Sequence, residues 1–132
     1  MAAREQNPAE SDKVLNSPVD TDMVVFDRQG MMTRLMDDGE LVQIVCDGFI
    51  GDIPLQMTAL RGYLEKGDGA AVERQAHTIK GAAANVGGNA LRSVALQMEA
   101  AAKTGDLDIA RALLYDLERQ FASLKKAMME QV

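Results

Sequence analysis

The sequence is poor in the residues that most often mark disulfides, metal sites or β-structure. It has no tryptophan, only three phenylalanines and two tyrosines, three prolines, one cysteine and one histidine. Cys46 has no partner for an internal disulfide, and one cysteine with one histidine does not supply the four ligands of a structural zinc site. No apolar run approaches the ~18 residues of a membrane span, and no signal peptide is evident. We therefore expect a cytoplasmic chain with no metal site and no membrane segment.

The charge balance excludes a further group of functions. Fourteen Lys and Arg stand against 20 Asp and Glu, which gives a net charge of −6 in a chain of 132 residues. An acidic chain is a poor partner for nucleic acid or for an anionic membrane surface. The length is that of a single domain, and the abundant alanine, leucine and methionine favour helices over strands. These features predict an all-α domain.

The first 22 residues differ from the rest of the chain. They contain Pro8 and Pro18, lack a sustained apolar period, and carry two positive and five negative charges. Such a segment is typical of a disordered tail or linker. The predicted folded domain is therefore 23–132, with 1–22 outside it.

Apolar periodicity and turn residues divide the folded part into helices. A weakly periodic stretch over 23–36, interrupted by Gly30, predicts a short helix. Asp37 and Glu40 resemble the capping box of the helix that follows. That next helix has apolar residues at spacings of three and four: Val42, Val45, Phe49, Ile53, Met57, Leu60 and Leu64. Pro54 falls inside the pattern, so the segment is either one kinked helix or two helices with a break between them. We favour the kinked helix.

Three more helices follow. Asp68 is the expected cap of a helix that ends near Val86 at Gly87-Gly88, and Asn89 is the expected cap of the next. The turn at 104–106 separates that helix from the last. The three predicted core stripes are 72/76/79/83/86, 91/94/95/98/102 and 110/113/117/121/124/128. Short connections between four long amphipathic helices predict an antiparallel up-down-up-down bundle with a short extra helix in front.

One side chain is a candidate nucleophile. His77 lies about 140° from the centre of its helix's apolar stripe, so it is expected to be accessible. Gly81, one turn away, is unfavourable in a helix interior, Ala84 is also small, and Lys80 places a cation within reach of the imidazole. A flat surface with an imidazole and an ammonium suits holding a phosphoryl group. An ordinary surface histidine is the alternative interpretation.

The same region has no phosphate-binding loop and no acidic metal site, so a partner protein would have to supply the metal and the second phosphoacceptor. The run from Ala76 to Gly87, which reads AHTIKGAAANVG, resembles the HxxKG…G motif of histidine-containing phosphotransfer (HPt) domains of bacterial phosphorelays. The resemblance extends over about residues 26–128. It implies that His77 is the phosphoacceptor, that Lys80 supports it electrostatically, and that Gly81 lets a receiver domain approach. It also implies that the receiver, not this chain, holds Mg²⁺.

Helix register suggests one further site residue. If the turn between the third and fourth helices is centred on Gly88, residues 77 and 99 are equidistant from it and lie opposite each other. Glu99 is then placed to accept a hydrogen bond from Nδ1 of His77, which would leave Nε2 as the nucleophile. A solvated helix position is the alternative for Glu99. Arg74, Gln75 and Ala84 are candidates for contact with the partner, and a solvated helix face explains Arg74 and Gln75 equally well.

Three functional interpretations follow from these residues. The leading one is a phosphocarrier without its own kinase site, which accepts a phosphoryl group from a receiver phospho-Asp and relays it to another receiver Asp. The second is a non-catalytic helical interaction module in which His77 is incidental. The third is an enzyme that uses His77 as a general base. The resemblance suggests a monomer. The cognate receivers, the direction of transfer, and whether the chain is free-standing or part of a hybrid sensor kinase stay open.

Overall fold

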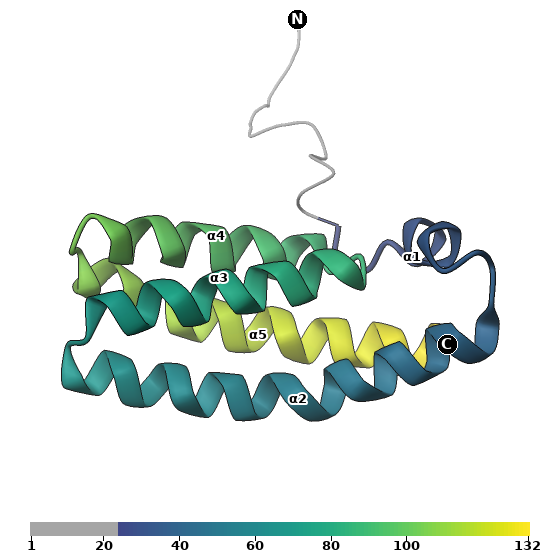
Figure 1. The fold of residues 1–132 in the computed structure, drawn as a ribbon, viewed down its shortest axis with the longest axis horizontal. Helices are drawn as coiled ribbons and strands as arrows, with labels where there is room; N and C mark the ends of the chain where they lie inside the picture. The colour runs from purple at the N-terminus through teal and green to yellow at the C-terminus, as the bar shows by residue number, and fades with distance from the viewer. Residues whose placement is uncertain (1–23) are drawn as a thin grey trace, which may run out of the picture.

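A computed structural model describes residues 24–132, which form five helices. They are α1 (Arg28–Arg34), α2 (Gly39–Lys66), α3 (Gly69–Asn85), α4 (Asn89–Lys103) and α5 (Leu107–Gln131). The four long helices run along one axis as an antiparallel bundle, and α1 lies at one end (Figure 1). The predicted all-α bundle with a short extra helix is confirmed. The predicted tail, 1–22, lies outside the described residues.

Aspartates cap four of the helices. Asp27, Asp38, Asp68 and Asp106 each accept a hydrogen bond from a backbone N–H in the first turn of the following helix. The prediction that Asp37 caps α2 is wrong by one residue. Met36 and Asp37 both have left-handed backbone, with φ of 59° and 60°, so the chain is still turning at Asp37 and only Asp38 has the extended conformation of an N-cap.

Two other predicted boundaries also need correction. Asn89 is the first residue of α4 and not its cap; Gly88 occupies the N-cap and provides no side-chain cap. The first helix is shorter than the predicted stretch, because residues 24–27 are not helical. By contrast, α2 continues as one helix through Pro54, so the alternative of two separate helices is excluded. Pro54 has no N–H and therefore cannot donate the backbone hydrogen bond that other residues of the helix interior make.

The core lies between the four long helices and is filled by aliphatic, alanine and methionine side chains. Most residues of the predicted stripes are buried; Val45, Val94, Leu113 and Phe121 are half-buried at its margin. The largest fully buried side chains come from every helix: Met31, Val42, Ile53, Leu60, Val72, Ile79, Val86, Leu91, Met98, Leu117, Leu124 and Met128. No described helix is long and apolar enough to cross a membrane.

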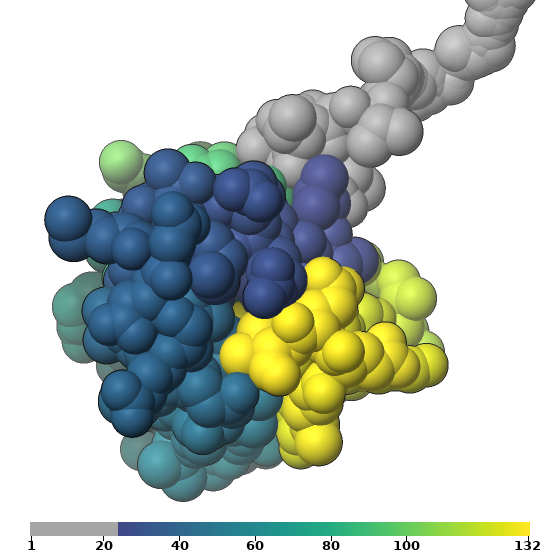
Figure 2. All heavy atoms as spheres, turned by 90° about the vertical axis from the view of Figure 1, so that its right-hand side faces the viewer, coloured from purple at the N-terminus to yellow at the C-terminus, as the bar shows by residue number. Residues whose placement is uncertain are grey.

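Residues of the segment before α2 form hydrogen bonds with the C-terminal end of α3 and the turn that follows it. The Asp27 N–H donates to the Gly87 carbonyl at 2.8 Å, and the Ala90 N–H donates to the Val24 carbonyl at 2.8 Å. Arg34 donates to two carbonyls of the last turn of α3, those of Ala84 and Asn85. In the end-on view α1 lies against the C-terminal end of α5 (Figure 2). These contacts fix the α3–α4 turn and, with it, the register of the two helices.

Candidate functional site

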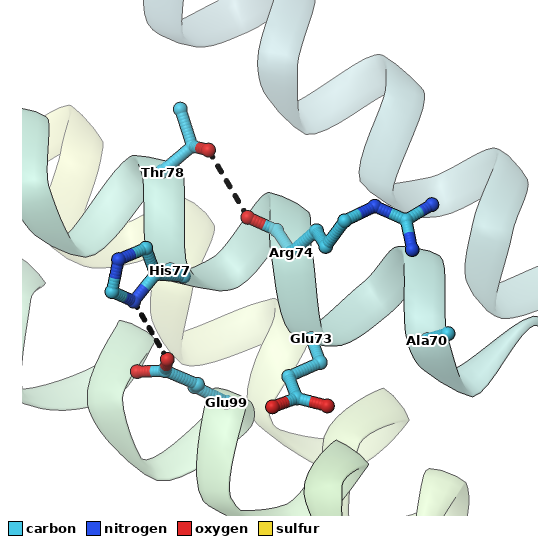
Figure 3. Close-up of a pocket in the computed structure, with 6 residues that line it drawn as sticks. All are labelled: Ala70, Glu73, Arg74, His77, Thr78 and Glu99. Carbon is cyan, nitrogen blue, oxygen red and sulfur yellow. Dashed lines mark hydrogen bonds and ion pairs between the residues drawn. The ribbon is translucent and has the colours of Figure 1, made fainter.

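The one histidine of the chain lies on the outer surface of α3. Its neighbours Ala76 and Ile79 are fully buried, so the helix turns His77 toward solvent, and 63% of its side chain is exposed. The ring stands beside α4, on the side from which Glu99 projects (Figure 3). A nucleophile in this position can be reached by a group as large as another protein domain.

The imidazole and the lysine one turn away share a single carboxylate. Nδ1 of His77 lies 2.7 Å from Oε2 of Glu99, and Nζ of Lys80 lies 2.7 Å from Oε1 of the same side chain. Glu99 and Lys80 are mostly buried, with 18% and 22% of their side chains exposed. The two donors of α3 are therefore held by one acceptor of α4, and this orients the ring.

The charge state of Glu99 determines which nitrogen carries the proton. The hydrogen bond from Lys80 is the main cause that lowers the pKa of Glu99; the bond to His77 adds to it, and burial opposes it. Glu99 is thus a carboxylate at neutral pH, and a carboxylate only accepts hydrogen bonds. Nδ1 must therefore be the donor. In the neutral ring, Nε2 then carries the free lone pair and faces away from Glu99.

The contact between His77 and Glu99 follows from the register of the α3–α4 hairpin. Gly88 lies at the centre of the turn, eleven residues from each, as expected from the sequence. The sequence did not indicate that Lys80 would bond the other oxygen of the same carboxylate. Spacing alone placed Lys80 near His77 on α3, whereas sharing Glu99 depends on the rotation of α4 about its axis.

No large side chain projects from α3 at the two positions that follow His77 on its face of the helix, because both residues are small. Gly81 is exposed, and a Cβ added there would meet no atom within 4 Å. Ala84 is half-buried, and its carbonyl accepts the bond from Arg34. Nothing in the fold requires a glycine at position 81, so its small size leaves room for something outside the molecule.

The two predicted partner contacts next to His77 differ in their surroundings. Arg74 is exposed, and its guanidinium extends away from His77 toward a neighbouring helix (Figure 3). Gln75 is half-buried, and its amide donates to Oε1 of Gln56 on α2 at 3.1 Å. The structure therefore brings His77, Lys80 and Glu99 together, keeps Gly81 and Ala84 alongside them, and turns Arg74 and Gln75 toward α2.

A shallow hollow of about 570 Å³ adjoins the histidine. Its lining includes Glu73, which flanks His77 on α3, and Thr78, which the sequence did not indicate. The Glu73 carboxylate lies on the same side of α3 as Glu99 (Figure 3), and the Thr78 hydroxyl donates to the Arg74 carbonyl. The full lining is Ala70, Glu73, Arg74, His77, Thr78 and Glu99. Among residues 24–132, no cluster of three His, Cys, Asp or Glu side chains could hold a metal ion.

Comparison with known families agrees with this geometry. The family model described as the Hpt domain matches residues 45–127, which include all of α3 and α4. This chain belongs to the Hpt domain family. It is thus a phosphotransfer domain of the kind that works in phosphorelays with receiver domains, and the comparisons find no kinase domain. No curated protein matches the chain.

A solved structure shows the same architecture. The crystal structure of histidine-containing phosphotransfer protein B (HptB) from Pseudomonas aeruginosa PAO1 superimposes on this Hpt domain with a TM-score of 0.76 and 25% sequence identity. The alignment covers 81% of this chain and 93% of the other. The resemblance inferred from the His77 motif is therefore confirmed at the level of family and fold.

Proposed function

We propose that His77 accepts a phosphoryl group on Nε2 from the phospho-Asp of one receiver domain and passes it to the Asp of another. The observation that carries the proposal is the exposed imidazole whose Nδ1 is held by the Glu99 carboxylate. That bond fixes the ring in one tautomer and leaves Nε2 free to attack.

The transfer is a simple exchange of bonds at phosphorus. The Nε2 lone pair forms a bond to phosphorus while the bond to the aspartyl oxygen breaks, and the aspartate leaves as a carboxylate. In the onward step an aspartate oxygen of the second receiver attacks, and His77 recovers its lone pair. The Nδ1 proton stays on the ring, where Glu99 balances the positive charge that develops in the phosphorylated imidazole.

The neighbouring residues are assigned supporting roles. Lys80, one turn from His77, is placed to offset the negative charge of the phosphoryl oxygens. Gly81 and Ala84 keep the surface low so that the receiver can approach, and Arg74 and Gln75 lie where its edge would rest. Mg²⁺ belongs to the receiver in this scheme, and the need for receivers makes the cytoplasm the expected compartment. The Hpt domain acts as a monomer.

The test is phosphoryl transfer from a radiolabelled phospho-receiver with Mg²⁺. The wild-type chain should take up label that is lost in acid and retained in base, as expected for phosphohistidine. His77→Gln should take up none while keeping the same circular dichroism spectrum and Tm, since the side chain is exposed. Equal labelling of both proteins would contradict the proposal, as would a folded wild-type chain that no receiver labels; that second result would favour an interaction module.

A further inference from the structure

Lys103 is a cation beside the His77 site that pairs with no group of that site in the structure. It is the last residue of α4 and lies four positions after Glu99, so the two side chains share one face of the helix. Lys103 also lines a second hollow, of about 280 Å³, whose other walls are Lys80, Leu96, Glu99 and Ala100. It is exposed, and within residues 24–132 its ammonium has no ion pair or hydrogen bond.

The charges of the unphosphorylated site are already paired without Lys103. Glu99 carries one negative charge and Lys80 one positive charge, and Nζ of Lys80 lies 2.7 Å from Oε1 of Glu99. The neutral imidazole of His77 adds no charge and uses the other oxygen of the same carboxylate. A second ammonium therefore has no anion to neutralise in this state, which agrees with the unpaired side chain of Lys103.

A phosphoryl group on His77 changes this balance. The group carries about two negative charges at neutral pH, and the ring that keeps its Nδ1 proton carries one positive charge. With Lys80 and Glu99 included, the site then has a net charge of about −1. Lys80 is drawn toward the phosphoryl oxygens, so the mostly buried Glu99 carboxylate loses part of the positive charge beside it.

We propose that Lys103 pairs with Glu99 when Lys80 turns to the phosphoryl group. The inference rests on the proposed function and adds how the phosphorylated site keeps its charges balanced. A glutamate four residues before a lysine is the favourable order for an ion pair on a helix. The ammonium of Lys103 is carried on a flexible chain and can reach Glu99 across the hollow that both residues line. Lys103 is thus a positioning residue that acts on His77 through Glu99.

The equilibrium constant of phosphoryl transfer measures this role. For transfer from a purified phospho-receiver to the Hpt domain, the ratio of the forward and reverse kcat/KM values gives that constant, which does not depend on how tightly the two proteins dock. Lys103→Met should lower it about threefold, the size expected for an ion pair at an exposed position. Lys103→Arg keeps the positive charge and should retain the wild-type value. Raising the salt to about 0.5 M should reduce the difference between wild type and Lys103→Met, because salt screens an exposed pair.

Lys66→Met is the matched control. Lys66 ends α2 as Lys103 ends α4, so each lysine interacts favourably with the dipole of its own helix. Lys66 lines neither of the two hollows beside His77. Both methionine variants should therefore lower the Tm by a similar small amount, and only Lys103→Met should change the equilibrium constant.

A double variant tests whether Lys103 acts through Glu99. In a Glu99→Gln background there is no carboxylate to pair with, so Lys103→Met should no longer change the equilibrium constant. An equal effect in both backgrounds would overturn the inference, because Lys103 would then act on the phosphoryl group directly. An equilibrium constant for Lys103→Met equal to that of wild type would also overturn it and leave the proposed function intact. A wild-type chain that takes up no label would refute the proposed function and this inference with it.

Discussion

The Glu99 carboxylate balances the positive charge of the site. One carboxylate faces an imidazole N–H and an ammonium, so the unphosphorylated site is close to neutral in spite of the acidity of the chain. When a phosphoryl group is bound at Nε2, Lys80 has a second anionic partner within reach of its flexible side chain. We propose that Lys80 is then shared between Glu99 and the phosphoryl oxygens.

The positioning role of Glu99 can be separated from its charge by two substitutions. Glu99→Ala removes the acceptor for Nδ1, so the ring is no longer held in one tautomer, and transfer from a phospho-receiver should slow about tenfold. Glu99→Gln keeps an oxygen acceptor and should retain most of the rate. The measurement is the transfer rate at saturating receiver, with the imidazole tautomer read by ¹⁵N NMR. Wild-type rates in both variants would show that Glu99 is an ordinary surface residue.

The lowered pKa of Glu99 also predicts a pH dependence of folding. The carboxylate stabilises the native state at pH values above its unfolded pKa of about 4.3, and this contribution is lost as the pH falls through the lower, native pKa. Wild-type stability should therefore fall more steeply between pH 6 and pH 3 than that of Glu99→Gln. Urea unfolding across this range gives both slopes. Equal slopes would mean that Lys80 and His77 do not stabilise the charged form.

At the scale of elements, the connection between α3 and α4 sets the register that brings His77 to Glu99. Gly87 has φ of 74°, and a Cβ there would lie 2.5 Å from the Asp27 carbonyl oxygen. The same glycine carbonyl accepts the Asp27 N–H. The turn is thus fixed by backbone conformation and by close packing of the segment before α1.

Gly87→Ala should therefore destabilise the domain more than the same substitution at a glycine that has positive φ but no close neighbour. Gly105 is the matched control, because its φ is 83° but a Cβ there would meet nothing within 4 Å. We expect a loss of about 1 kcal/mol for Gly105→Ala and of about 3 kcal/mol or more for Gly87→Ala. Chemical denaturation measures both. An equal loss in the two variants would show that the contact with Asp27 adds nothing.

The elements were largely predictable from local sequence, and the errors have local causes. Core stripes and the cap Asp68 followed from apolar spacing and from aspartate next to glycine. Asp37 and Asp38 are adjacent, and the left-handed backbone at Asp37 that moves the cap is not visible in the sequence. The Gln56–Gln75 and Arg34–Ala84 bonds join residues 19 and 50 positions apart. Such contacts depend on helix rotation, which periodicity does not specify.

For the whole molecule, the family match over 45–127 and the similarity to HptB show an Hpt phosphotransfer domain. We propose that residues 23–132 fold independently as this domain. Deletion of 1–22 should leave the Tm and the labelling of His77 unchanged. A deletion that also removes 23–27 should lower the Tm, because the Val24 carbonyl and the Asp27 N–H bond the α3–α4 turn. A large loss of stability on removing 1–22 alone would place the boundary of the domain further upstream.

We propose that Nε2 of His77 carries the phosphoryl group while Glu99 holds Nδ1. The chain has a single histidine, so ¹H–¹⁵N and ³¹P NMR of the phosphorylated protein report on this ring without assignment. We expect a phosphorus coupling to Nε2 and a proton retained on Nδ1. Phosphorus on Nδ1, or label with no phosphorus–nitrogen bond, would contradict it.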